Sequence, residues 1–244
     1  MTSFTAEEAR KRWVAKLGEE TGTFFRNLEN DLYGLRDLWR VYIGLFGANQ
    51  ERIDLLNSIS GITAFLIEKI MLESVMLSIC KLTDPEEGPR KSKNITIWRL
   101  PGYLTKGADT ELEDLIKLAE EKSEFARTWR NKRIAHSDDD TRNGRSSLDV
   151  VNTGNIREAT DAIATCIKRF AQLELDVDLV THPISALGND EVEFLQVLHY
   201  GKIELDRREK ESRQVALSGD WKAGRELMEL PEWLTFRPDH ELDV

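Results

Sequence analysis

The sequence has little proline, glycine or cysteine: six, fifteen and two in 244 residues. Because proline and glycine are the main breakers of regular structure, long uninterrupted elements are favoured. Two cysteines, Cys80 and Cys166, are too few for the disulfide framework of a small secreted domain. We therefore expect a cytoplasmic protein in which both thiols are small core side chains.

Long hydrophobic runs and an excess of positive charge are also lacking. The richest apolar window, residues 62–82, contains four charged side chains, so we expect no membrane span and no membrane partner. The formal net charge of −10 gives no whole-molecule attraction for nucleic acid. Any RNA contact must therefore come from a local basic patch.

What the sequence does have is helical periodicity, because its apolar residues recur at three and four positions rather than at two. The stretch 59–82 is apolar nearly all round, which predicts a central, buried helix. Asn155 is the expected N-cap of the helix that follows residue 154. No segment alternates in the manner of a strand. The expected helices are 5–17, 24–46, 59–82, 109–136, 155–175 and 191–217.

These helices predict an all-α fold, an antiparallel bundle over residues 1–187 with short connections. From about Gly188 the chain becomes more charged and its apolar face thinner. We interpret residues 188–244 as an appended C-terminal helical arm. Two roles stay open for this arm and its Trp221 and Trp233: further helices packed on the bundle, or a docking arm for a partner.

Familiar metal and nucleotide motifs fail on inspection. Gly102 and Gly107 have the spacing of P-loop glycines, but Ala108 and Asp109 stand where lysine and a hydroxyl residue must hold phosphate and magnesium. Val150 stands where a calcium loop needs its bidentate glutamate. The four histidines are too dispersed for a zinc set. We expect no metal and no cofactor.

The remaining chemical feature is a basic cluster near the end of the long helix expected from residue 109. Arg127, Arg130, Lys132 and Arg133 precede His136 within ten positions. Cationic side chains could hold a phosphate there while the imidazole exchanges a proton with a nearby hydroxyl. The structural alternative is a solvated basic turn, because cations at a helix C-terminus are favoured by the helix dipole.

The segment R-N-K-R-I-A-H-S-D also resembles the R-x(4-6)-H motif of the HEPN superfamily, in which a polar residue directly after the arginine is typical. The preceding SVMLSICKLTDPEEG and NITIWRL are similar to the corresponding region in the HEPN branch named after phage abortive-infection proteins. The resemblance covers about residues 59–175. It makes Arg130 the motif arginine, Asn131 its polar neighbour and His136 the motif histidine.

The resemblance implies a HEPN-like bundle that forms a homodimer, with two motifs facing each other across the interface. Many such proteins are metal-independent endoribonucleases of toxin–antitoxin or antiviral defence systems, which implies an RNA substrate and an antitoxin or regulatory protein as partner. In that reading His136 transfers protons and Arg130 stabilises charge on the phosphorane, with a 2',3'-cyclic phosphate as product. Asn131 orients the histidine or binds a phosphate oxygen.

Further RNA contacts are expected from Arg127, Lys132 and Arg133, which flank the motif arginine. A single motif provides one histidine, whereas cleavage by acid and base needs two proton-transfer positions. Two-fold pairing would supply the second. Two other interpretations stay open: a non-catalytic HEPN-like module that senses RNA or a nucleotide, and a structural interaction protein.

Overall fold

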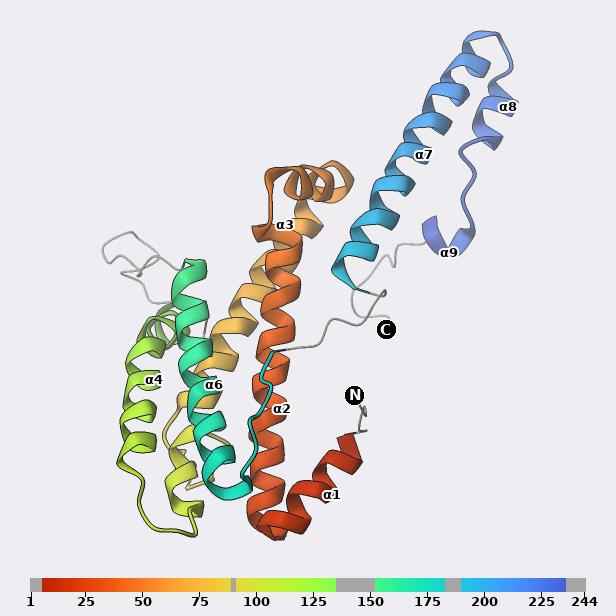
Figure 1. Cartoon of the computed structure of the whole chain (residues 1–244). Coiled ribbons are helices and arrows are strands. Elements are labelled where there is room, and N and C mark those ends of the chain that lie inside the picture. The colour runs from red at the N-terminus through yellow and green to blue at the C-terminus, as the bar shows by residue number, and fades with distance from the viewer. Residues whose placement is uncertain (1–5, 89–90, 135–151, 183–189, 236–244) are drawn as a thin grey trace. The chain divides into compact units, whose positions relative to one another are not determined.

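The computed structural model describes residues 6–88, 91–134, 152–182 and 190–235, and their regular structure is helical throughout (Figure 1). An isolated bridge between Glu87 and Lys93 is the only β-type pairing in these ranges. The all-α prediction is confirmed. Among the same residues, no helix is both long enough and apolar enough to cross a bilayer.

The chain divides into two compact units. The first comprises Met1–Ala48 and Ile62–Ala186, and the second comprises Asn49–Gly61 and Leu187–Val244. The sequence predicts a change of organisation near residue 188. It does not predict that residues 49–61 belong with the C-terminal part of the chain.

The first unit is a helical bundle in which α2, α4, α6 and the second part of α3 pack around one core, while α1 folds back on α2. Short π-helical turns, η1 and η3, extend α2 and α4. The 3-10 helix η2 lies between α3 and α4. The bounds are α1 Ala6–Leu17, α2 Glu19–Tyr42, η1 Ile43–Gly47, α3 Gln50–Thr83, η2 Ile97–Tyr103, α4 Thr110–Trp129, η3 Arg130–Ile134 and α6 Thr153–Leu175.

Local chemistry sets where these helices begin. Gly18 adopts a φ of 82°, which suits glycine, and α2 starts at once after it rather than at residue 24 as expected. The Asp109 carboxylate accepts a hydrogen bond from the Leu112 amide and caps α4. The cap of α6 is Asn152, whose side chain accepts from the amide of Asn155. The prediction that Asn155 is itself the cap is therefore wrong.

The core is made of large apolar side chains that α2, α3 and α6 turn toward one another. Phe25 of α2 and Phe170 of α6 have ring centroids 5.1 Å apart, and both are fully buried. Leu28, Ile79 and Ile163 are also fully buried. Each such side chain contributes about 1.5–3 kcal/mol relative to an exposed one, so this shared core fixes the α3 end against the other helices.

A buried carboxylate joins α1 to α2. Glu29 is 4% exposed, and its Oε2 accepts from Trp13 Nε1 at 3.0 Å and from Arg26 Nη1 at 2.8 Å. Tyr33 Oη lies 3.3 Å from Glu29 Oε1 and donates to the Val180 carbonyl at 2.7 Å. Burial beside this carboxylate raises the pKa of Tyr33 to about 12. These bonds satisfy a charge that would otherwise be costly to bury.

The helix expected to be central and buried is buried only in its second half. Val75, Met76 and Ile79 are fully buried, whereas Ile62 is 78% exposed and Phe65 is 62% exposed. The helix is also interrupted at Ser60, whose backbone is extended. The expectation of burial over all of 59–82 is therefore wrong for the segment before residue 71. An apolar run in the sequence predicts a helix, but it does not determine which other part of the chain, if any, packs against it.

The second unit contains the Gln50–Gly61 part of α3, the long helix α7 (Glu191–Leu217), and the short helices α8 (Trp221–Glu226) and α9 (Glu232–Thr235). Helix α8 packs on α7, where Ser212 Oγ donates to the Gly224 carbonyl at 2.6 Å. Trp221 and Trp233 are 71% and 75% exposed. The bounds of α7 are those expected for the helix over residues 191–217.

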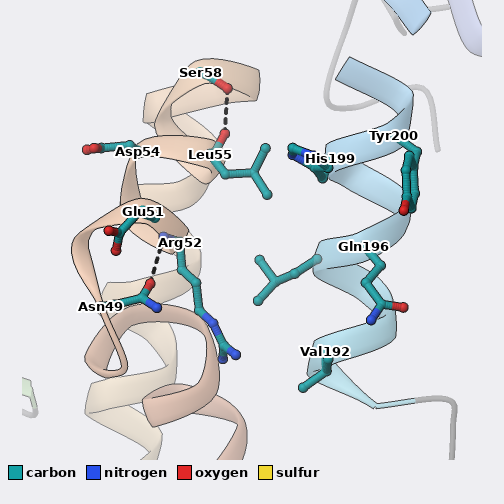
Figure 2. A pocket seen from close by; sticks show the side chains of 11 residues that line it. Asn49, Glu51, Arg52, Asp54, Leu55, Ser58, Val192, Gln196, His199 and Tyr200 are labelled. Carbon is teal, nitrogen blue, oxygen red and sulfur yellow. Dashed lines mark hydrogen bonds between the residues drawn. The ribbon is translucent and has the colours of Figure 1, made fainter. Parts of the chain in front are cut away.

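An open pocket of about 550 Å³ lies within this second unit, between the first turns of α3 and the first turns of α7 (Figure 2). Leu55 and Val192 give it apolar walls, and Arg52, His199 and Tyr200 add polar groups. His199 points toward Leu55 across the pocket (Figure 2). None of these residues belongs to the predicted site.

Candidate functional site

The motif arginine, Arg130, lies where α4 gives way to the π-helical turn η3. The sequence predicts a continuous α-helix through residue 136, and η3 corrects this over Arg130–Ile134. Spacings counted in α-helical turns therefore do not describe how these basic residues are arranged. Such π-turns are rare and occur frequently at functional sites.

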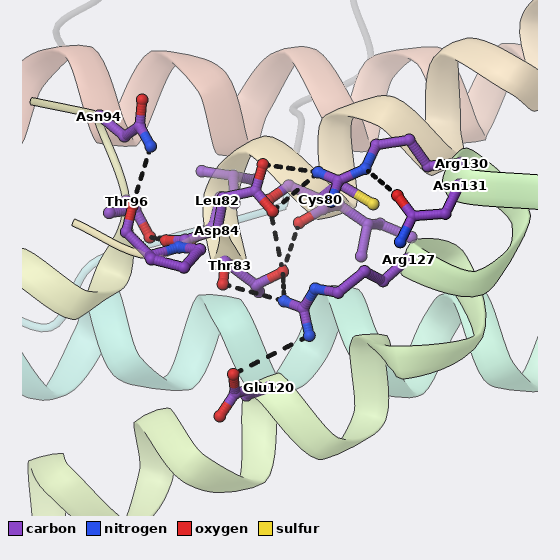
Figure 3. Close-up of polar contacts among 12 residues, drawn as sticks. Cys80, Leu82, Thr83, Asp84, Asn94, Thr96, Glu120, Arg127, Arg130 and Asn131 are labelled. Carbon is purple, nitrogen blue, oxygen red and sulfur yellow. Dashed lines mark hydrogen bonds and ion pairs between the residues drawn. The ribbon is translucent and has the colours of Figure 1, made fainter. Parts of the chain in front are cut away.

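Arg130 forms an ion pair with Asp84, the residue that follows the last turn of α3 (Figure 3). Arg130 Nη1 donates to both carboxylate oxygens of Asp84, at 2.8 and 2.7 Å. Both side chains are 25% exposed, so water reaches the pair. The hydrogen bond that Arg130 donates to Asp84 raises the pKa of Arg130 further, and the guanidinium is cationic at all relevant pH.

Asn131 also contacts the arginine. Its Oδ1 accepts from Arg130 Nε at 3.2 Å, although the two residues are neighbours in the chain. Asn131 itself is exposed. Arg130 Nη2 donates to no acceptor within the described residues. The contacts of Nε and Nη1 therefore fix the plane of the guanidinium, and Nη2 is the group with capacity for a further acceptor.

Arg127 has a different position, one turn earlier on α4. Its Nη2 donates to the Thr83 carbonyl at 3.1 Å and lies 3.5 Å from Thr83 Oγ1, and its side chain is 17% exposed. Its Nη1 pairs with Glu124 at 3.0 Å. Arg127 thus joins α4 to the end of α3, and both terminal nitrogens of its guanidinium donate to groups of the protein. Its immediate role is structural.

The other two predicted RNA-contact residues lie beyond Arg130 in η3. Lys132 is half-buried and Arg133 is exposed. The Arg133 guanidinium lies over the Trp129 ring, 5.1 Å from its centroid. Such a contact is worth about 0.5–1 kcal/mol at an exposed site. It leaves the edge of the guanidinium available for hydrogen bonds.

His136, the predicted proton-transfer residue, lies outside the described residues, as do the acidic residues that follow it. Of the predicted site, the structure brings together Arg130 and Asn131, and Arg127 lies close by through its bond to Thr83 (Figure 3). Asp84, which was not predicted, binds Arg130 beside them. In the described ranges, no three side chains of metal-binding type gather in one place.

Sequence reasoning missed Asp84, which is 46 positions before its partner. Asp84 precedes a proline, and the Asp84-Pro85 pair is by itself only a signal for the end of a helix. A weak signal was present, because an acidic residue at the end of one core helix and a basic one at the end of another can meet when antiparallel helices pack. Cys80, beneath the pair, is buried, and burial raises the pKa of its thiol to about 11.

The bundle and the arginine-centred cluster are consistent with an all-α HEPN-like domain in which the motif arginine is held at a helix end. A family model described as AbiU2, HEPN_AbiU2, matches residues 18–191. The chain therefore belongs to the HEPN_AbiU2 family, a family of HEPN-type domains associated with abortive infection. No curated protein and no solved structure matches the chain.

Proposed function

We propose that this protein is a metal-independent endoribonuclease of an abortive-infection or toxin–antitoxin system. The observation that carries the proposal is the orientation of Arg130, whose Nε and Nη1 donate to Asn131 and Asp84, while Nη2 has no acceptor within the described residues and can meet a phosphate oxygen. Membership of the HEPN_AbiU2 family supports the same activity.

In the proposed reaction the ribose 2'-hydroxyl attacks the adjacent phosphorus and the bond to the 5'-oxygen breaks. This leaves a 2',3'-cyclic phosphate on one product and a 5'-hydroxyl on the other. Arg130 stabilises the negative charge that develops on the phosphorane. His136 accepts the 2'-hydroxyl proton or protonates the leaving oxygen, because an imidazole near its ordinary pKa can do either at neutral pH.

The other predicted site residues have different roles in this proposal. Lys132 and Arg133 contact phosphates on either side of the cleaved bond, since they follow Arg130 and are at least partly exposed. Asn131 keeps Arg130 oriented and presents its amide to the substrate. Arg127 holds the end of α3 by its bond to Thr83, the residue before Asp84, so loss of Arg127 should affect folding as much as RNA affinity.

A homodimer belongs to the proposal, because each motif carries one histidine and the reaction has two proton transfers. The first unit also exposes an apolar surface that a second copy would cover, with Ile62, Phe65 and Ile70 at 60% exposure or more. Several exposed large apolar side chains on one helix are typical of interaction sites. Specific activity should fall on dilution as dimers separate, and a constant activity from a monomer in light scattering would contradict this part.

The function is tested with single-stranded RNA and purified protein in the presence of a chelator. Wild type should cleave, whereas Arg130→Ala and His136→Ala should each lose about 10²–10⁴-fold in rate, as expected for loss of a charge-stabilising or proton-transfer group. Lys117→Ala, which removes an exposed lysine paired with Asp114 on α4, is the matched control and should keep full activity.

Two other results would replace the proposal. RNA binding without cleavage, unchanged in His136→Ala, would indicate an RNA-sensing module. Neither binding nor cleavage would indicate a structural interaction protein. For the biological role, growth arrest on expression should disappear in His136→Ala, and a neutralising partner should restore growth with wild type.

A further inference from the structure

At the end of α3, a carboxylate that lies outside the R-x(4-6)-H segment binds the motif arginine. Asp84 binds Arg130 Nη1 with both carboxylate oxygens, at 2.8 and 2.7 Å. A carboxylate that holds a guanidinium by charge-assisted hydrogen bonds restricts its rotation. Arg130 would otherwise be a long side chain on an exposed helix end with many rotamers to lose on binding.

The backbone of Asp84 is itself held. Its amide donates to the Cys80 carbonyl at 2.7 Å, which continues the hydrogen bonding of α3 by one residue. Its carbonyl accepts from Thr96 Oγ1 at 2.7 Å, and the same hydroxyl lies 3.0 Å from the Leu82 carbonyl (Figure 3). Thr96 is fully buried. The last carbonyls of α3, which have no partner within the helix, thus receive a buried donor.

We infer that Asp84 is a positioning residue for the reaction: it fixes the Arg130 guanidinium for the scissile phosphate, and Thr96 fixes Asp84. The inference rests on the proposed ribonuclease function and adds to it a residue outside the R-x(4-6)-H motif. Asp84 neither touches the substrate nor transfers a proton. It acts by pre-organisation, for which a misplacement of about 1 Å can cost about 100-fold in rate.

The Asp84 carboxylate could also have the opposite effect on the reaction, inhibition. A paired carboxylate neutralises the charge of Arg130 and competes with a phosphate for the guanidinium. Under that reading Asp84 inhibits, and its removal would speed cleavage. Nη1 is the nitrogen that Asp84 uses, whereas Nη2 stays available among the described contacts, and this favours positioning over competition.

The test measures kcat and KM for RNA cleavage by the full chain. Asp84→Asn keeps the size of the side chain and removes its charge, and kcat should fall by about 10–100-fold with KM changed by less than about threefold. Asp84→Glu keeps a carboxylate and should recover part of the loss. The matched control is Asp161→Asn, which removes an ion pair with Arg36 elsewhere in the bundle and should leave both constants unchanged.

A second readout does not depend on activity. In ¹⁵N NMR spectra the Arg130 Nη1–H signals, assigned by their loss in Arg130→Lys, should be protected from exchange in wild type, because Nη1 donates to Asp84, and should resemble those of free arginine in Asp84→Asn. Unchanged kcat, faster cleavage or unchanged Nη1–H signals in Asp84→Asn would overturn the inference. An inactive Arg130→Ala beside a fully active Asp84→Asn would overturn it and leave the proposed function standing. An inactive wild type would refute the function, and the NMR signal would still decide the positioning.

Discussion

The buried hydroxyl of Thr96 gives a sharp prediction about stability. Its Oγ1 lies 2.7 Å from the Asp84 carbonyl and 3.0 Å from the Leu82 carbonyl, both at the end of α3. Thr96→Val keeps the shape of the side chain and removes the donor that these carbonyls share. Leaving a buried polar group unsatisfied costs about 1–3 kcal/mol, which for a domain of this size lowers the midpoint of thermal unfolding by several degrees.

Thr96→Ser is the matched variant, because it keeps the hydroxyl and loses only a methyl group. Urea unfolding followed by circular dichroism should rank the free energy of unfolding as wild type, then Thr96→Ser, then Thr96→Val. Cleavage should fall in Thr96→Val, because Asp84 loses its backbone anchor, and hold in Thr96→Ser. A Thr96→Val protein as stable and as active as wild type would refute the hydrogen-bond argument.

Three further predictions concern the bundle. A Cβ at Gly22 would lie 2.6 Å from the α1 backbone, so Gly22→Ala should destabilise by about 1–3 kcal/mol in urea unfolding, whereas Gly34→Ala, with open space around it, should be neutral or stabilising. Hydrogen bonds from Arg169 and a backbone amide lower the pKa of Asp109 in the folded protein. The ionised Asp109 therefore stabilises the fold above the unfolded pKa near 3.8, and this contribution is lost as the pH falls through the lower folded pKa. Asp109→Asn should accordingly flatten the acid side of a plot of unfolding free energy against pH. Burial raises the pKa of Cys80 to about 11, so iodoacetamide at pH 8 should modify it only after unfolding, and rapid native labelling would contradict its burial.

Much of the fold follows from the sequence because helical periodicity records which residues face the core. The helix over 191–217 begins and ends where predicted, and α1 ends at Leu17 as expected. Periodicity does not record what covers an apolar face, so Ile62 and Phe65 were expected inside and are exposed. The π-helical turn at Arg130 changes hydrogen-bond register without any change in residue pattern, so no sequence signal marked it.

The site was predictable only as far as the motif reaches. Arg130 and Asn131 are adjacent in sequence, and their side chains do meet. The contact between Arg130 and Asp84 depends on the packing of α3 against α4, and neither residue alone predicts it. Arg127 is predicted to contact RNA because of its charge, but in the structure its Nη2 donates to the Thr83 carbonyl at the end of α3 and its Nη1 pairs with Glu124.

The chemistry of the RNA ends tests the central proposal most directly. With a chelator present, wild type should produce fragments that end in 2',3'-cyclic phosphate and begin with 5'-hydroxyl, and an oligonucleotide with a 2'-deoxy group at the cleaved position should remain intact. Fragments with 3'-hydroxyl and 5'-phosphate ends, or cleavage of the deoxy-substituted strand, would contradict a reaction in which the ribose hydroxyl attacks beside Arg130 and His136.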